Sequence, residues 1–181
     1  MNWEFDFLYL LQELHNPVPD KIMVAITTLG DAGLIWILLA VALLFTKKYR
    51  KYGATMALAL IMMLVFGNGI LKNIFMRERP CWIDTGVALL IENPHDYSFP
   101  SGHTFSSIAA ATVILLRNKK AGIVAMVLAV LIAFSRMYLF VHFPTDILAS
   151  LFLGVITAVI AHVLVNKYYD TIAKKLTERK K

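Results

Sequence analysis

The chain has 181 residues, of which 59% are hydrophobic, and it carries a formal net charge of +6. This length suits one domain, and the apolar content excludes an ordinary soluble protein. The basic residues are spread over the ends of apolar segments and form no single basic face, which argues against a nucleic-acid partner. The single cysteine, Cys81, excludes an internal disulfide and a cysteine-based zinc cluster.

The first segment, residues 1–15, has the pattern of an amphipathic helix. Its apolar residues recur at helical spacing, while the polar residues fall mostly elsewhere. Such a helix either lies in the membrane interface or packs on the rest of the bundle, and the pattern favours neither. No basic region and no small-residue cleavage site come first, so we expect no cleavable signal peptide. The apolar residues are Trp3, Phe7, Leu10, Leu11 and Leu14.

Five apolar runs follow, and four of them approach the ~20 residues that a membrane-spanning helix needs. The runs are Ile22 to Phe45, Gly53 to Leu71, Thr104 to Leu116, Ala121 to Phe140 and Ile147 to Val165, and only the third is short. The sequence therefore predicts an all-α fold: a polytopic membrane bundle of about five transmembrane helices in a single domain, 1–181. The domain would include an interfacial segment, 1–20, and a basic tail, 167–181.

The lysines and arginines predict the orientation of this bundle. If all five runs span, the segments 46–52 and 117–120 and the tail from Lys167 share one side and hold 13 of the 18 basic residues. That side should be cytoplasmic, and it includes the C-terminus. The remaining five are Lys21, Lys72, Arg77, Arg79 and Arg136, and four of these lie near the polar segments of the opposite side. Cations on the side that is normally poor in them indicate a function.

The first polar segment of that side is "KNIFMRERP". Lys72 and Arg79 are seven residues apart, so on one helix they lie about two turns apart on the same face, and Pro80 would help to end the helix. Arg77 would point elsewhere. Two cations on one face suit a single anion, and the arginine can grip two phosphate oxygens. The alternative is that both side chains merely reach the membrane interface.

The second segment is "YSFPSGHTFSS", where Ser101 precedes an apolar run and is predicted as a helix N-cap. A helix N-terminus binds anions, and Gly102 would let a ligand approach the backbone closely. His103 would follow in the first turn. From Pro100 to Leu116 the run covers only about 25 Å against a ~30 Å hydrocarbon core, so the helix should start below the membrane surface. Alternatively, this is only a capped helix whose histidine faces the headgroups.

The third segment, "SRMYLFVHFPTD", contains Arg136, His142 and Asp146. An aspartate four residues after a histidine can accept a hydrogen bond from one ring nitrogen and leave the other as a nucleophile. By itself this spacing often marks only a helix cap. The three segments together place two histidines, an aspartate and several cations on one predicted face, without indicating which histidine attacks.

These residues resemble the type 2 phosphatidic acid phosphatase superfamily of integral membrane lipid phosphatases. Its signature is Lys-x6-Arg-Pro, Pro-Ser-Gly-His and Ser-Arg-x5-His-x3-Asp, which here run over Lys72 to Pro80, Pro100 to His103 and Ser135 to Asp146. The resemblance implies that His142 forms a phosphohistidine, that Asp146 orients it, and that His103 protonates the leaving lipid oxygen. Water would then hydrolyse the phosphoenzyme. The implied phosphate-binding residues are Lys72, Arg79, Ser101, Gly102 and Arg136. No cofactor and no metal ion are expected.

The substrate and the reaction leave alternatives open. Small members of this kind resemble undecaprenyl-diphosphate phosphatases, while phosphatidic acid, phosphatidylglycerol phosphate and diacylglycerol pyrophosphate are also possible lipid partners. Transfer of the phosphoryl group to an acceptor other than water suits the same residues. A lipid-binding or transport protein would need the cations, but it has no need for two histidines and a His–Asp pair. Many relatives carry a further N-terminal spanning helix, which this sequence replaces with the amphipathic segment, and no feature sets an oligomeric state.

Four further features lie outside the signature. Asp31, flanked by Gly30 and Gly33, is predicted at a helix break or close packing contact, with a supporting role near the site as the alternative. The loop from Cys81 to Phe99 either covers the site or only connects two helices, and its His95 is expected to be solvated. His162 is expected to be a satisfied residue of the bundle, and the run "GNG" at 67–69 predicts close helix packing.

Overall fold

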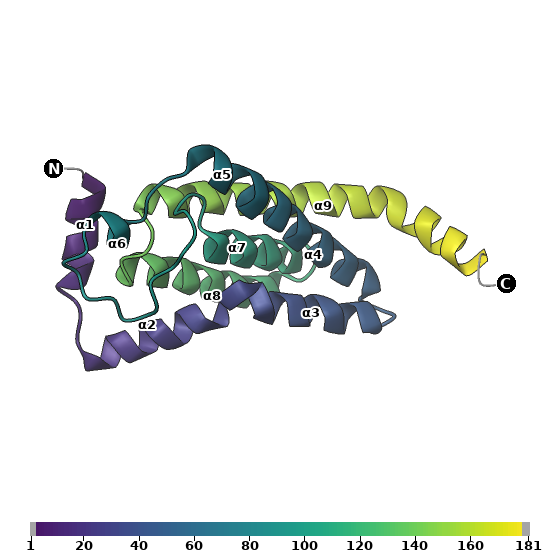
Figure 1. Ribbon diagram of the computed structural model, residues 1–181. Coiled ribbons are helices and arrows are strands. Elements are labelled where there is room, and N and C mark those ends of the chain that lie inside the picture. Colours follow the sequence, from purple (N-terminus) through teal and green to yellow (C-terminus); the bar gives the residue numbers. More distant parts are fainter. Residues whose placement is uncertain (1–2, 179–181) are drawn as a thin grey trace.

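The computed structural model describes residues 3–178, without the side chains of residue 170 and of residues 172–178. Every regular element in this range is a helix, which confirms the predicted all-α membrane bundle. The long helices run side by side in an elongated bundle, and α1 crosses one end of it (Figure 1). Of the predicted basic tail, 167–181, only residues 179–181 lie outside the described residues, and the rest continues a long helix, α9 (Pro144–Glu178).

Within residues 3–178, four helical stretches are long and apolar enough to cross a membrane. They are Pro17–Phe45, Arg50–Ile83, Lys119–Tyr138 and Pro144–Tyr169. The first contains α2 (Pro17–Leu29), η1 (Asp31–Gly33) and α3 (Leu34–Phe45); the second contains α4 (Arg50–Met62), η2 (Met63–Leu71), α5 (Lys72–Phe75) and α6 (Pro80–Ile83). The last two are α8 (Lys119–Tyr138) and the start of α9 (Pro144–Glu178). The short third run forms α7 (Gly102–Leu115).

Helix α7 is the centre of the bundle. It has 14 residues, so it extends about 21 Å, less than the ~30 Å of a hydrocarbon core. It lies between α8 and α9, which supply most of its contacts (Figure 1). Residues 104–113 are all buried, and the small side chains of Ala109, Ala110 and Ala111 let the neighbouring helices approach closely. The structure thus encloses the predicted short helix instead of exposing it to lipid.

Two helices depart from regular geometry beside α7. The first span breaks at η1, where Ala32 and Gly33 have φ angles of 50° and 66°, in the left-handed region that suits glycine. The second span widens into a π-helix at η2, where a Cβ atom on Gly67 would lie 3.0 Å from the ring of Phe105. Such π-helical turns are common at functional sites. Both irregular segments face the start of α7, and both shape the site described below.

Helix α1 (Trp3–Gln12) packs on the bundle, which is one of the two positions that its sequence left open. One face packs on the bundle through buried Leu8 and Leu11, and Gln12 donates a 3.0 Å hydrogen bond to the backbone carbonyl of Tyr138. Its outward side shows Trp3 and Leu10, with exposed fractions of 58% and 60%. The helix is therefore fixed to the bundle end and still offers an apolar face to a membrane interface.

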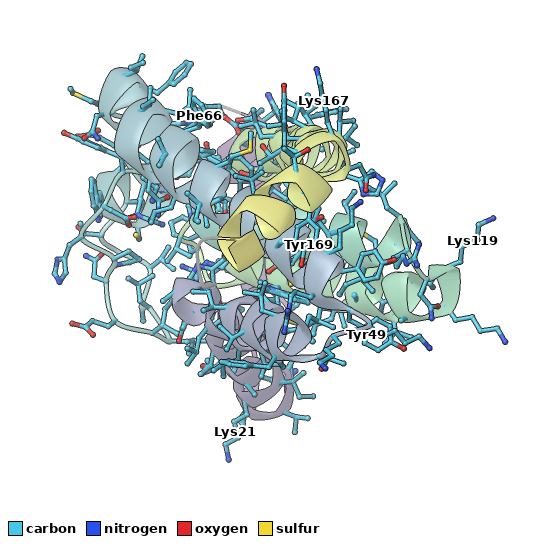
Figure 2. The ribbon with its side chains drawn as sticks, turned by 90° about the vertical axis from the view of Figure 1, so that its right-hand side faces the viewer. Lys21, Tyr49, Phe66, Lys119, Lys167 and Tyr169 are labelled. Carbon is cyan, nitrogen blue, oxygen red and sulfur yellow. The ribbon has the colours of Figure 1, made fainter. Side chains whose placement is uncertain are left out.

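The opposite end of the bundle carries the basic segments. Figure 2 looks along the bundle from this end and shows Lys119 and Lys167 pointing outward. Tyrosines lie among these cations: the guanidinium of Arg117 lies 4.2 Å from the centroid of the Tyr52 ring. Cations and aromatic side chains are typical of a membrane–water boundary.

Candidate active site

The three polar segments of the sequence meet at a cavity of about 330 Å³. It is lined by six of the eight predicted site residues: Lys72, Arg79, Gly102, His103, Arg136 and His142. The other two, Ser101 and Asp146, are fully buried beside it. The eight residues come from α5, the connection to α6, α7, the end of α8 and the start of α9, so the fold brings all of them together.

His142 lies between α8 and α9, and it is almost fully buried. Its Nε2 atom is 3.1 Å from Nη1 of Arg79. A guanidinium can only donate, so Nε2 accepts, and the proton of the neutral ring is on Nδ1. Burial lowers the pKa of His142 well below its ordinary value, and the charges of Arg79, Arg136 and Lys72 lower it further. The ring is therefore neutral, with the lone pair of Nε2 directed at the cationic wall of the cavity.

Ser98 joins His142 to Asp146. Nδ1 of His142 is 3.6 Å from Oδ2 of Asp146, which is longer than a hydrogen bond. The hydroxyl of Ser98 lies 3.3 Å from Nδ1 and donates to the same carboxylate oxygen at 2.5 Å. The carboxylate of Asp146 also caps α9, because it accepts a 2.9 Å bond from the backbone N–H of Phe143. This bond holds it away from Nδ1 of His142. His142 and Asp146, the predicted His–Asp pair, are thus connected by hydrogen bonds through Ser98. The spacing of the motif does not predict this serine.

His103 has an acidic partner of its own. Its Nε2 atom is 2.9 Å from Oδ1 of Asp31, whose side chain is 61% exposed. The break at η1 brings Asp31 there, and Gly30 permits the approach: a Cβ atom on Gly30 would lie 2.8 Å from Cδ2 of His103. This contact fits the alternative interpretation of Asp31, a supporting role near the site. The signal in the sequence was an acid between two glycines inside an apolar run.

The path of the chain from Lys72 to Arg79 differs from the prediction. Helix α5 ends at Phe75, where Met76 takes a left-handed conformation with φ of 42°. Arg79 is extended and precedes Pro80, which begins α6 instead of ending α5. The prediction of one helical face was therefore wrong, because a residue before proline avoids helical geometry. The two cations still converge, since both reach the carboxylate of Asp96.

Asp96 places a negative charge between these two cations. Arg79 donates to its Oδ1 atom at 2.6 Å, and Lys72 binds its Oδ2 atom. Burial alone would raise the pKa of Asp96, but the hydrogen bonds and charges of Lys72 and Arg79 outweigh it and lower the pKa to about 2. The loop from Cys81 to Phe99 thus covers the site, with a carboxylate in the place that suits a bound anion. No spacing in the sequence separates Asp96 from the other acids of this loop.

Arg136 is the third buried cation, and its hydrogen-bond partner is a hydroxyl instead of a carboxylate. Its Nη1 atom donates to the hydroxyl of Thr27 at 2.6 Å, and among the described residues its buried Nε atom has no hydrogen-bond partner. A buried cation without a hydrogen-bonded anion is costly. An anionic ligand in the cavity would supply what Arg136 lacks.

The N-terminus of α7 forms another part of the wall. Ser101 is its N-cap, and the hydroxyl accepts a long 3.4 Å bond from the N–H of Thr104. A Cβ atom on Gly102 would lie 3.4 Å from Oδ1 of Asn68, which also lines the cavity. Asn68, from "GNG", therefore belongs to the site, although its sequence indicated only helix packing. The N-terminus of α7 adds the positive end of its helix dipole to the cations.

Other candidate residues lie away from the cavity. His95 is 89% exposed and 4.0 Å from Glu92, and His162 pairs with Asn166 at 2.8 Å on α9. Within the described residues, no group of three or more His, Cys, Asp or Glu side chains is placed to hold a metal ion.

Comparison with known proteins places this site in a family. Residues 48–170 match the model of the PAP2 superfamily. Undecaprenyl-diphosphatase BcrC of Bacillus subtilis is 33% identical over 190 residues, which cover 99% of this chain and 97% of that protein. An undecaprenyl-diphosphatase of Sulfolobus acidocaldarius is 36% identical over 121 residues, 66% of this chain, and the match spans only 58% of that relative.

Solved structures agree with the sequence relatives. LpxE of Aquifex aeolicus superposes with a TM-score of 0.79 at 27% identity, covering 89% of this chain and 95% of that one. A PAP2 type phosphatidylglycerolphosphate phosphatase from Bacillus subtilis gives a TM-score of 0.70 at 28% identity, covering 91% and 83%. The match to the family model covers more than half of the chain, and it contains all three polar segments that form the cavity. The chain therefore belongs to the PAP2 superfamily.

Proposed function

We propose that the protein is a membrane lipid phosphatase that hydrolyses a phosphate monoester or diphosphate through a phosphohistidine intermediate. The observation that carries this proposal is the convergence of three buried cations and a neutral histidine on one cavity. Cations gathered in a site of low polarity stabilise a phosphoryl group, and the lone pair of a neutral imidazole is available for attack.

In the first step, Nε2 of His142 attacks phosphorus, and the bond from phosphorus to the lipid oxygen breaks. His103 in its protonated form gives its proton to that oxygen. Burial and the charge of Arg136 lower the pKa of His103, so its protonation relies on the carboxylate of Asp31 and on the negative charge of the bound phosphate. Positive charge develops on His142, and the carboxylate of Asp146 stabilises it through the hydroxyl of Ser98, which accepts from Nδ1 and donates to Oδ2. Lys72, Arg79 and Arg136, together with the N-terminus of α7, hold the phosphoryl oxygens, displacing the carboxylate of Asp96.

In the second step, a water molecule attacks the phosphohistidine. His103, now neutral, accepts the proton of that water, and the bond from phosphorus to Nε2 of His142 breaks. Inorganic phosphate leaves, and both histidines return to their starting forms. Transfer to an acceptor other than water would differ only in the molecule that attacks.

An apolar cavity beside the site supports a lipid substrate. It has a volume of about 330 Å³ and lies between α3 and the second span, lined by side chains such as Ile37, Leu60 and Ile61. It shares four lining residues with the cationic cavity, namely Ala32, Gly33, Met63 and Leu64. The two cavities therefore adjoin each other. A lipid whose phosphate lies among the cations would place its tail in the apolar cavity.

The relatives and the charges suggest which lipid is cleaved and on which side. Undecaprenyl diphosphate is favoured by the names of two relatives, with phosphatidic acid, phosphatidylglycerol phosphate and diacylglycerol pyrophosphate as alternatives. The basic end of the bundle favours a cytoplasmic C-terminus and a site on the extracytoplasmic face of the cell membrane. A lipid-binding or transport protein is disfavoured, because it would not need His103 paired with Asp31.

The test is phosphate release from a panel of these four lipids by the purified protein in detergent. His142→Ala should abolish release, whereas His162→Ala, a matched change on α9 away from the cavity, should not. EDTA should leave release unchanged. Full activity of His142→Ala would refute the nucleophile, and loss of activity in EDTA would refute the metal-free mechanism.

A further inference from the structure

Arg77 contacts the far side of the active-site carboxylate. Its Nη1 atom donates to Oδ1 of Asp146 at 2.7 Å and to the hydroxyl of Thr145 at 2.6 Å. Its guanidinium also lies 4.1 Å from the centroid of the Phe143 ring. Arg77 does not line the cationic cavity, as its direction away from Lys72 and Arg79 in the sequence predicted. Its side chain therefore binds no phosphate there and reaches the site through Asp146, while its backbone carbonyl accepts a 2.8 Å bond from the N–H of Ser98.

Glu4 of α1 holds Arg77 from the other side. Its Oε2 atom accepts a 2.6 Å bond from Nη2 of Arg77, while Oε1 accepts from the N–H and the hydroxyl of Thr145 at 3.2 and 2.7 Å. Glu4 is 5% exposed, and an acid so buried needs such partners. The interfacial helix α1 is thereby joined to the first turn of α9, which carries Asp146.

These contacts fix the orientation of the carboxylate. With Oδ1 held by Arg77, Oδ2 is the oxygen that faces Ser98 and the N–H of Phe143. The same Oδ2 atom is the one nearest Nδ1 of His142. Without Arg77, Oδ1 would be a buried charged oxygen without this partner, and the group could turn away from Ser98. The positive charge of Arg77 also pairs with the negative charge of the buried Asp146 carboxylate.

We propose that Arg77 and Glu4 are positioning residues for the reaction, and that α1 is a working part of the active site. Arg77 orients Asp146, and Glu4 orients Arg77. This inference rests on the proposed phosphatase function, and it adds two residues that touch neither phosphate nor the reacting atoms. It predicts a loss of turnover at unchanged substrate affinity, because the phosphate-binding cations lie on the other side of His142.

The test compares variants by kcat and KM for the best lipid of the panel, together with the Tm of each purified protein in detergent. Glu4→Gln keeps an oxygen for Thr145 but removes the negative partner of Arg77, and it should lower kcat about three- to tenfold. Arg77→Gln should lower kcat about ten- to a hundredfold, and Arg77→Lys should recover part of it. KM should stay within about twofold in all three. Glu13→Gln, the same change at an exposed site just beyond α1, is the matched control and should behave like wild type.

The double variant Glu4→Gln/Arg77→Gln should be no slower than Arg77→Gln alone, because Glu4 acts through Arg77. Wild-type kcat in Glu4→Gln and Arg77→Gln, even with a lowered Tm, would overturn the inference and leave a purely structural network. If the losses of kcat in the two single variants add up in the double variant, Glu4 does not act through Arg77, and this part of the inference is overturned. If wild type releases no phosphate, or His142→Ala is as active as wild type, the proposed function fails and this inference fails with it. An active wild type with unaffected Glu4 and Arg77 variants refutes the inference alone.

Discussion

Replacing Asp96 by asparagine should make the site bind phosphate more tightly. The carboxylate of Asp96 lies between Lys72 and Arg79, two of the cations that we propose to bind the phosphate of substrate and product. Any anion that enters has to displace it. The asparagine side chain would have a similar size but carry no charge, so the two cations would be released for the ligand.

The structure sets the size of this effect. The pKa of Asp96 falls from 3.8 to about 2, which corresponds to about 2 kcal/mol in favour of the ionised group. The side chain is 58% exposed, so solvent screening reduces this to about 1 kcal/mol. One kcal/mol is about a fivefold change in affinity. The inhibition constant of inorganic phosphate should therefore fall about fivefold in Asp96→Asn.

The assay is inhibition of lipid hydrolysis by inorganic phosphate, with Glu92→Gln as the control, because Glu92 is an exposed acid of the same loop. The pH dependence gives a second check. A lowered pKa means that the carboxylate holds the cations at every pH above its ordinary value and releases them only as the pH falls towards 2. The fivefold difference should thus be constant between about pH 5 and pH 8. An unchanged or higher inhibition constant would show that Asp96 supports the cations instead of competing for them.

Three further variants test the histidines. His142→Ala should lower the rate of phosphate release at least about a thousandfold, measured on the lipid panel, and a stable phosphoenzyme should no longer form after mixing with substrate. Asp31→Asn should lower kcat about tenfold with little change in KM, because His103 would lose the partner that stabilises its protonated form. If kcat equals that of wild type, Asp31 has no part in the reaction. Gly30→Ala should lower kcat as well, since the new Cβ atom would meet Cδ2 of His103 at 2.8 Å and Cγ2 of Ile132 at 2.9 Å, whereas Gly86→Ala in the exposed loop should not. Wild-type turnover in Gly30→Ala would mean that His103 can shift without cost.

The sequence was most informative about residues with a fixed spacing. Apolar runs predicted the helices, and the motif spacing predicted the set of residues around the cavity, because both are local properties of the chain. The short third run predicted a short helix, and α7 has 14 residues against 20 in α8. The local path from Lys72 to Arg79 was wrong, since the proline rule acts on the preceding residue and the left-handed turn at Met76 has no clear signal.

Residues that act across long separations could not be predicted. Ser98 reaches Asp146 over 48 positions, and Asp31 reaches His103 over 72. Glu4 meets Arg77 over 73 positions, from a helix whose pattern indicated only an apolar face. Each of these contacts depends on how helices pack, and a single sequence contains no direct record of that packing. Glu4 fell among the polar residues of the amphipathic pattern of α1. The sequence alone does not distinguish a buried glutamate from one that faces solvent.

The enclosed position of α7 has a consequence for how the protein is assembled in the membrane. Its first turns carry Gly102, His103, Thr104, Ser106 and Ser107, which partition poorly into lipid, and the helix is too short to cross unaided. The partners that bury it are made both before and after it: Trp36 of α3 donates to Ser107, while α8 and α9 follow in the chain. Burial of α7 therefore depends on helices that are made later, and the cavity, which is lined by both Gly102 and His142, is complete only after α8 has been made.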